Sequence, residues 1–211
     1  MGEPGLVLRD IEIALNGKAL LAVSAHVAPS QTLTLMGPSG SGKSSLLAYI
    51  GGFLDPTFKA KGNVLLDGEE ITHKPAHERR TGILFQDPLL FPHMSVGENL
   101  LFAVPQTVNG SERRTRCEQA LEDAELSGFF DRDPATLSGG QKARVALMRV
   151  LLSRPKALLL DEPFSKLDTD LRDQVRRFVF AEAARQNLPV LLVTHDEADA
   201  TAAGGEIIRL D

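Results

Sequence analysis

Short apolar stretches alternate with helix-like stretches along most of the chain. Ile11, Ile13 and Leu15 occupy every second position, as in a strand with one buried face. Later apolar runs are continuous, as in strands that a parallel sheet buries on both faces. The pattern predicts strands at 6–8, 11–15, 20–27, 33–36, 63–66, 82–85, 157–161, 189–194 and 206–210.

Helical patterns are concentrated in the second half of the chain. Strand signals are weak over 87–155, where Pro105, Gly110 and Pro134 separate three helical stretches. We expect a loop at 55–62, and a buried stripe of Leu171, Val175, Phe178 and Val179 on the helix near 169–186. The predicted helices are 43–53, 96–104, 112–126, 139–153 and 169–186.

A glycine-rich segment joins a predicted strand to a predicted helix. Residues 37–44, GPSGSGKS, match the pattern GxxxxGK[ST]. In this setting backbone N–H groups surround phosphates, the Lys43 ammonium contacts the β- and γ-phosphates, and the Ser44 hydroxyl can bind Mg²⁺. The alternative is a turn that binds nothing. The predicted nucleotide-binding residues are Gly37, Pro38, Ser39, Gly40, Ser41, Gly42, Lys43, Ser44 and Ser45.

Two acidic residues follow the apolar run at 157–160. Ligands of α/β proteins bind at the carboxyl ends of parallel strands, which is where Asp161 and Glu162 are expected. We predict that Asp161 holds Mg²⁺ and that Glu162 polarises the attacking water. Taken alone, the two acids also fit an ordinary exit from a strand into a turn.

The segment LSGGQ at 137–141 begins a helix in an unusual way. Ser138 is a favourable N-cap, and the two glycines after it allow a backbone to approach a ligand closely. A helix N-terminus binds phosphate, yet residues 37–44 already form one phosphate site. Two such sites in one chain suggest a nucleotide shared between two copies. The candidate residues are Ser138, Gly139, Gly140 and Gln141.

Composition narrows the class of protein. The 211 residues suffice for one domain, and the net charge of −5, with both signs interspersed, argues against nucleic-acid binding. No apolar run approaches the length of about 18 residues that a membrane span needs, and Met1–Arg9 lacks a signal-peptide pattern. Cys117 is the only cysteine, which excludes an intrachain disulfide, and its helical spacing with Ala120 and Leu121 predicts a core position.

The segments GPSGSGKS, LSGGQ, LLLDEP, SKLD and TH, in this order, resemble the ATP-binding subunits of ABC transporters. The resemblance extends over nearly the whole chain. It implies an α/β fold: a P-loop NTPase core with a parallel sheet, an N-terminal antiparallel β-subdomain and an inserted helical subdomain. We expect a single ATPase domain over 1–211, with the core and the β-subdomain at 1–86 and 156–211 and the helical subdomain at 87–155.

The same resemblance implies roles for residues that spacing alone does not single out. Gln86 resembles the glutamine that contacts Mg²⁺ and the attacking water, and His195 resembles the histidine that contacts the γ-phosphate. Residues 165–168 resemble the D-loop, which joins the two sites of a dimer. The implied cofactors are ATP and Mg²⁺. The implied ATP-bound state is a homodimer, in which Ser138, Gly139 and Gly140 of the opposite copy close on the γ-phosphate.

The segment QDPLLFPHMSVGENL, which begins at Gln86, resembles the ATPases of bacterial importers for thiamine, molybdate, iron and putrescine. This implies integral-membrane permease subunits and a solute-binding protein as partners, no nucleic acid, and a cytoplasmic, peripheral location at the inner membrane. A thiamine-like or other small organic solute is expected. No C-terminal regulatory domain is expected, since the chain ends soon after His195. Leu89, Leu90, Phe91 and Met94 form either a groove for a partner's helix or a cap on the local core.

Two positions depart from the family pattern. The stretch 13–18 lacks the aromatic residue that usually stacks on adenine, and Leu15 is expected to offer an apolar face instead. Lys166 stands in the D-loop where a small residue is usual. Two alternative functions remain open at this point, the ATPase of a split-subunit exporter and a non-transport ABC ATPase that acts on nucleic acid. The long heptad segments typical of DNA-repair members are absent from the sequence.

Overall fold

The computed structural model describes residues 3–210, which form two compact units. The first unit comprises the chain up to Ile83, Lys156–Glu162 and the chain from Glu182 onward. The second comprises Leu84–Pro155 and Pro163–Ala181. Most of the helix near 169–186 therefore belongs to the second unit, whereas the sequence analysis placed that helix with the core. The proposed subdomain organisation remains a prediction.

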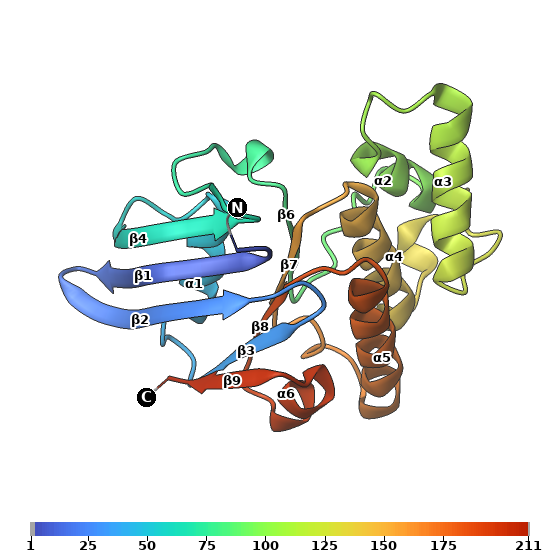
Figure 1. Ribbon diagram of the computed structural model, residues 1–211. Helices are drawn as coiled ribbons and strands as arrows, with labels where there is room; N and C mark the ends of the chain where they lie inside the picture. Colours follow the sequence, from blue (N-terminus) through green and yellow to red (C-terminus); the bar gives the residue numbers. More distant parts are fainter. Residues whose placement is uncertain (1–2, 211) are drawn as a thin grey trace. The chain divides into compact units, whose positions relative to one another are not determined.

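An antiparallel sheet forms one layer of the first unit (Figure 1). Its strand order is β2-β1-β4-β5, from β1 (Leu6–Leu15), β2 (Lys18–Val27), β4 (Phe58–Leu66) and β5 (Glu69–Glu70). The separate strands predicted at 6–8 and 11–15 are one strand, interrupted by a register shift between Leu8 and Ile11. The extra residues of this bulge let Leu8 and Ile11, three positions apart, both face the core, where each is at most 1% exposed.

The loop predicted at 55–62 is wrong from Phe58 onward, because β4 begins there. Lys59 and Lys61 are exposed and alternate with the half-buried Phe58 and Ala60, a strand pattern of period two. Charged residues and glycine weaken the local strand signal. Pairing with β1 over the antiparallel register supplies the stability that the local sequence does not.

A five-stranded sheet forms the second layer of the first unit. Its order is β6-β7-β8-β3-β9, from β6 (Thr81–Leu84), β7 (Ala157–Asp161), β8 (Val190–Thr194), β3 (Thr32–Met36) and β9 (Glu206–Arg209). Strands β7, β8, β3 and β9 pair in parallel, as predicted. Since β7, β8 and β3 run in the same direction, their carboxyl ends meet at one edge. The residues that follow them there are Glu162, His195 and Gly37.

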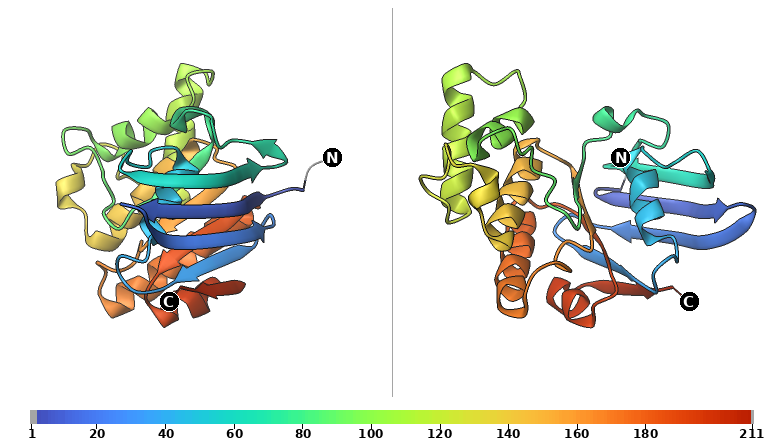
Figure 2. Two further views of the ribbon diagram at one scale, coloured as in Figure 1. Left: turned by 90° about the vertical axis from the view of Figure 1, so that its left-hand side faces the viewer. Right: turned by 180° about the vertical axis from the view of Figure 1, so that it is seen from behind.

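Helix α1 (Lys43–Gly51) packs between the two sheets of the first unit. It lies behind the antiparallel strands in Figure 1 and in front of them in the reverse view of Figure 2. Its buried Leu46, Leu47 and Ile50 belong to one apolar core with Ile13 of β1 and Leu159 of β7. This core fixes where α1 begins and hence where the loop before it lies.

The second unit is helical apart from Leu84, the end of β6. Its helices are α2 (Val96–Ala103), α3 (Gly110–Asp123), α4 (Gly139–Leu152) and the part of α5 (Thr169–Arg185) that ends at Ala181. All lie within three residues of the predicted bounds. Cys117 is fully buried in α3, which confirms the predicted core position.

Short helical segments complete the fold. Helix α6 (Glu197–Ala203), in the first unit, was not predicted; the Asp196 side chain caps it, and Gly204 ends it. The 3₁₀ turns are η1 (Ala76–Glu78) and η2 (Pro134–Thr136). None of the helices over residues 3–210 is long and apolar enough to cross a membrane.

Candidate functional site

The loop that the sequence predicts to bind phosphate lies between β3 and α1 in the first unit. Gly42 is the N-cap of α1 and has left-handed dihedral angles, φ 87° and ψ 6°. A Cβ atom at Gly42 would lie only 3.1–3.2 Å from the side chains of Leu21 and Leu20. Both the backbone conformation and the space therefore favour glycine. The first N–H groups of a helix can bind an anion, and phosphate binding at the start of α1 remains a prediction.

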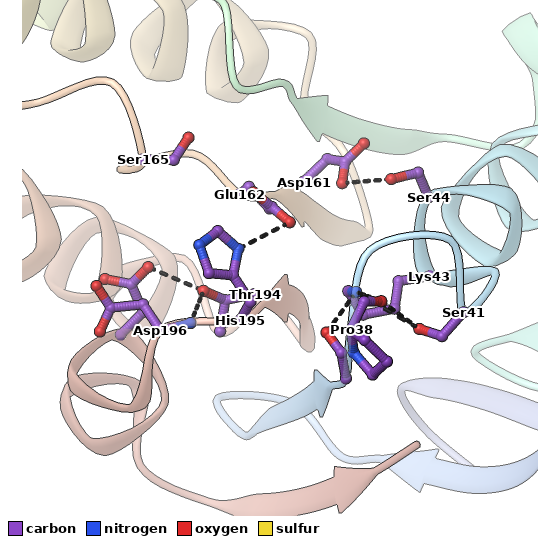
Figure 3. Close-up of polar contacts among 12 residues, drawn as sticks. Pro38, Ser41, Lys43, Ser44, Asp161, Glu162, Ser165, Thr194, His195 and Asp196 are labelled. Carbon is purple, nitrogen blue, oxygen red and sulfur yellow. Dashed lines mark hydrogen bonds and ion pairs between the residues drawn. The ribbon is translucent and has the colours of Figure 1, made fainter. Parts of the chain in front are cut away.

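The Lys43 ammonium is held by carbonyl groups of this loop (Figure 3). Its Nζ donates hydrogen bonds to the carbonyl oxygens of Gly37 and Pro38, both at 2.7 Å. The Ser41 hydroxyl donates to the same Pro38 oxygen at 2.9 Å. Lys43 is only 5% exposed, so its charge is fixed in place rather than spread over many rotamers. A phosphate oxygen can replace a carbonyl as the partner of this ammonium.

Ser44 and Asp161 provide adjacent oxygen atoms at the start of α1 and the end of β7. The Ser44 hydroxyl donates to Asp161 Oδ1 at 2.9 Å. Burial raises the pKa of Asp161 and neighbouring Glu162 adds to this effect, while the Ser44 hydrogen bond and the Lys43 charge oppose it. A divalent cation would compensate the charge of this half-buried carboxylate.

A hydroxyl and a carboxylate side by side are suitable ligands for Mg²⁺. No group of three or more His, Cys, Asp or Glu side chains that could hold a metal occurs within residues 3–210. Mg²⁺ commonly binds through one or two carboxylates together with substrate phosphates. The pair therefore fits Mg²⁺ that arrives with a nucleotide, while its role as ligand remains a prediction.

Glu162 and His195 lie side by side, at the ends of the neighbouring strands β7 and β8 (Figure 3). His195 Nδ1 is 3.1 Å from Glu162 Oε1. The backbone of Glu162 is in the left-handed region at φ 45°, and its N–H donates to the carbonyl of Val193 at 2.9 Å. Non-glycine residues in this region carry strain of about 1–3 kcal/mol and occur often at functional sites.

The residues that flank His195 are anchored by a small hydrogen-bond network. The hydroxyl of Thr194 donates to Asp199 Oδ2 and accepts from the Asp196 backbone N–H, both at 3.0 Å. Asp196 also caps α6 by accepting from the Ala198 N–H at 2.7 Å. His195 itself is mostly exposed, at 60% of its side chain. The exposed His195 imidazole therefore lies beside the Glu162 carboxylate, and hydrogen bonds hold the backbone on either side of it in place.

A cavity of about 340 Å³ opens beside the loop in the first unit. At one end it is lined by loop residues and Glu162, and at the other by three apolar side chains. Sequence reasoning identified Leu15 among these three but not Leu20 or Phe58. Their contribution depends on a bulge and on strand register, which no local pattern reveals. The lining residues are Leu15, Leu20, Ser39, Gly40, Gly42, Lys43, Ser44, Ser45, Phe58 and Glu162.

The LSGGQ segment begins α4 in the second unit. The Ser138 hydroxyl accepts from the Gln141 N–H at 3.3 Å, and Gln141 Oε1 accepts from the Ser138 N–H at 2.9 Å. This reciprocal capping box satisfies two N–H groups at the helix start. A Cβ atom at Gly140 would lie 2.4 Å from Leu171, so close packing against α5 requires glycine there. These contacts explain the local fold, and nucleotide binding by Ser138, Gly139, Gly140 and Gln141 remains a prediction.

Gln86 is exposed and also lies in the second unit. It lines a cavity of about 100 Å³ with residues that include Gly139 and Lys166. Lys166 of the D-loop segment forms an ion pair with Asp87 Oδ1 at 2.5 Å, directly after Gln86. No local sequence pattern predicts this ion pair, because the two positions are far apart along the chain. Contact of Gln86 with the metal and the attacking water remains a prediction.

The apolar segment after Gln86 packs in part against other residues of the second unit and is in part exposed. The Phe91 ring packs edge-on against Phe102, with centroids 5.1 Å apart. Arg149 Nη1 donates to the Leu89 carbonyl at 2.9 Å, which ties the segment to α4. The Leu89 side chain is nevertheless 57% exposed. A local cap and a partner groove therefore both remain compatible with this segment.

Comparison with known proteins identifies the family. The family model described as "ABC transporter" matches residues 20–165. An ABC transporter ATP-binding protein of Escherichia coli K12, YnjD, is 49% identical over 198 residues, which cover 93% of this chain and 91% of that protein.

Two import ATP-binding proteins are also similar. The Fe(3+) ions import ATP-binding protein FbpC 1 of Haemophilus influenzae is 40% identical over 209 residues, covering 98% of this chain and 62% of that protein. The spermidine/putrescine import ATP-binding protein PotA of Bacillus cereus is 40% identical over 190 residues, covering 90% of this chain and 57% of that protein. The chain thus spans about three fifths of these two longer relatives. On this evidence the chain belongs to the ABC transporter family, as an ATP-binding subunit.

Proposed function

We propose that this chain hydrolyses ATP to drive the import of a small solute through separate membrane permease subunits. Family membership and the names of the relatives, which include import proteins for Fe(3+) and for spermidine/putrescine, support the proposal. The observation that carries it is the Glu162–His195 pair, 3.1 Å apart, in the same unit as the phosphate-binding loop. This arrangement supplies the groups that phosphoryl transfer to water requires.

Each candidate site residue of the first unit has a distinct role in the proposed hydrolysis. Lys43 and the loop N–H groups hold the phosphates and neutralise charge as it develops. Glu162 accepts a hydrogen bond from a water molecule and orients it for attack, and His195 holds the Glu162 carboxylate in position through Nδ1. Ser44 and Asp161 would hold Mg²⁺, which supplies positive charge to the phosphates when bound.

The proposed assembly is a homodimer that ATP stabilises. In it, Ser138, Gly139 and Gly140 of one copy contact the γ-phosphate bound by the loop of the other, with Gln86 near the metal. Hydrolysis then removes the contact that holds the copies together, and the opening works on the permeases. A solute-binding protein and a position at the cytoplasmic face of the membrane belong to the same proposal.

The first test is phosphate release by the purified chain. We expect turnover with ATP and Mg²⁺, and almost none when EDTA removes the metal. Absence of turnover in the chain alone would call for the same assay with the proposed permease subunits present. No turnover in either assay would contradict the proposal.

Transport in vesicles decides between import and export. The chain and its permeases are reconstituted with the ATPase on the outside, and candidate solutes are placed in the lumen together with the solute-binding protein. Efflux from the lumen toward the ATPase side on addition of ATP corresponds to import. In a parallel assay with the solutes supplied on the outside, ATP-dependent uptake into the lumen would favour the split-subunit exporter.

A further inference from the structure

We propose that Phe58 supplies the aromatic face on which the nucleotide base stacks, with Leu15 and Leu20 forming the rest of an apolar base pocket. The inference rests on the proposed function and specifies how its substrate is held. The stretch 13–18, where the family pattern has an aromatic residue that stacks on the base, contains none. The inference assigns this stacking role to the first residue of β4 instead.

The cavity beside the phosphate-binding loop has two chemically different ends. One end carries the Lys43 ammonium, the Ser44 hydroxyl and the loop backbone, which suit phosphates. The other end carries Leu15, Leu20 and Phe58. A nucleoside triphosphate is polar at its phosphates and has a flat, largely apolar face at its base. With the phosphates in the loop, the base therefore lies toward the end that contains Phe58.

Strand pairing places Phe58 next to Leu15. The two residues are direct cross-strand partners in the antiparallel pair of β1 and β4. Side chains of such partners lie on the same face of the sheet with Cβ atoms about 5 Å apart. Leu15 lies in the stretch 13–18, where the family pattern has an aromatic residue. The register thus brings an aromatic ring from the neighbouring strand next to this stretch.

The backbone of Phe58 is fixed by the turn that precedes it. The Asp55 carboxylate accepts from the Thr57 N–H at 2.8 Å and from the Thr57 hydroxyl at 2.6 Å. The Phe58 N–H donates to the Asp55 carbonyl at 3.0 Å. The ring is half-buried and packs against the core, so one face is supported while the residue still lines the cavity. A base that stacks there need not order a flexible side chain, which favours binding.

A bulge in β2 brings Leu20 into the same wall. Ile13 pairs with Leu21 and Ala14 pairs with Ala19, so Leu20 is an extra residue without a cross-strand partner. Bulges of this kind redirect a side chain. The Leu20 Cβ lies 3.2 Å from the point where a Cβ on Gly42 would be, which places it directly against the phosphate-binding loop. Leu20 therefore connects the phosphate end of the cavity to the apolar end.

A single-tryptophan variant tests the inference directly. The chain has no tryptophan, so Phe58→Trp introduces the only indole. We expect ATP to change the indole fluorescence strongly, while inorganic tripolyphosphate, which lacks a base, changes it little. Equal responses to ATP and tripolyphosphate would overturn the proposal, because the indole would then report only on the loop.

Affinity measurements provide the second test. Removal of the ring in Phe58→Ala should weaken ATP binding by about five- to tenfold, the usual effect of lost base stacking. Tripolyphosphate binding should stay within about twofold, and Phe58→Trp should retain the affinity for ATP. The matched control is Phe53→Ala, which removes a 47% exposed phenyl group of the same unit that does not line the cavity. It should leave both affinities unchanged.

The outcomes separate this inference from the proposed function. Wild-type protein that binds ATP, with no loss in Phe58→Ala, would contradict the base pocket alone. Equal losses for ATP and tripolyphosphate in Phe58→Ala would show a purely structural role and would also contradict it. Wild-type protein that binds neither ligand would contradict the proposed function itself.

Discussion

His195 Nδ1 lies 3.1 Å from Glu162 Oε1, although the two residues belong to different strand–helix connections. The contact arises because β7 and β8 are neighbours in the parallel sheet and end at the same edge. The exposed imidazole is thereby fixed to the less exposed carboxylate. The proposed water-orienting group and its support are thus already assembled within one unit.

Removal of the imidazole should impair hydrolysis without impairing binding. His195→Ala leaves the Glu162 carboxylate without its support, and we expect turnover to fall by about 10² or more. The dissociation constant for ATP should change by less than about threefold. Steady-state phosphate release and a binding titration measure the two effects. A variant that keeps full turnover would show that the pair has no part in the chemistry.

The Lys43 ammonium should contribute to the affinity for ATP and not only to the rate of hydrolysis. Hydrogen bonds to charged groups contribute about 1.5–3 kcal/mol, so Lys43→Ala should weaken ATP binding by roughly tenfold to a hundredfold. Lys59→Ala is the control, because Lys59 is an exposed lysine of the same unit, outside the loop. Isothermal titration with ATP compares the three proteins. Equal affinity in wild type and Lys43→Ala would contradict the role of the loop.

Bulk at the start of α4 should block ATP-driven dimerisation. Ser138→Arg places a long cation where the partner's nucleotide is proposed to lie, and it also removes a helix cap worth about 1 kcal/mol. Ser95→Arg removes the equivalent capping box of α2 in the same unit and so controls for the lost cap. In a hydrolysis-deficient background, light scattering with ATP should show dimers for Ser95→Arg and monomers for Ser138→Arg. Dimers from Ser138→Arg would show that LSGGQ does not make the contact between copies.

The thiol of Cys117 should be unreactive in the folded protein. Burial raises its pKa to about 11, so the thiolate is scarce at pH 8 and the sulfur is shielded from reagents. We expect slow reaction with a thiol reagent under native conditions and rapid reaction in denaturant. The reactive fraction should rise with pH only in the strongly alkaline range. Fast reaction at pH 8 without denaturant would contradict the buried placement.

Much of the fold follows from local patterns, and the exceptions have a common cause. The continuous apolar runs of β7 and β8 and the glycine pattern before α1 each predict their element correctly, because burial on both faces and a phosphate-binding turn demand particular residues. The β1 bulge and the first half of β4 were missed. Both are stabilised by pairing with strands distant in the sequence, and the local composition is ambiguous.

The candidate site shows the same division. The predicted phosphate-binding loop, Asp161 and Glu162 were singled out because each follows a recognisable strand, whereas His195 was singled out by the resemblance to ABC ATPases. The sequence could not reveal that Phe58 stands opposite Leu15, or that Lys166 pairs with Asp87. Those contacts depend on strand register and on the path of loops, which arise only when the chain is folded.

The most direct test of the account is the Glu162→Gln variant, compared with wild type for hydrolysis and for ATP binding. The amide keeps the shape of the side chain and an oxygen that can contact His195, but it lacks the charge that polarises water. We predict turnover at least about a hundredfold lower, an ATP dissociation constant within about threefold of wild type, and a stable ATP-bound dimer. Turnover close to that of wild type would contradict the assignment of Glu162 and with it the proposed chemistry of the site.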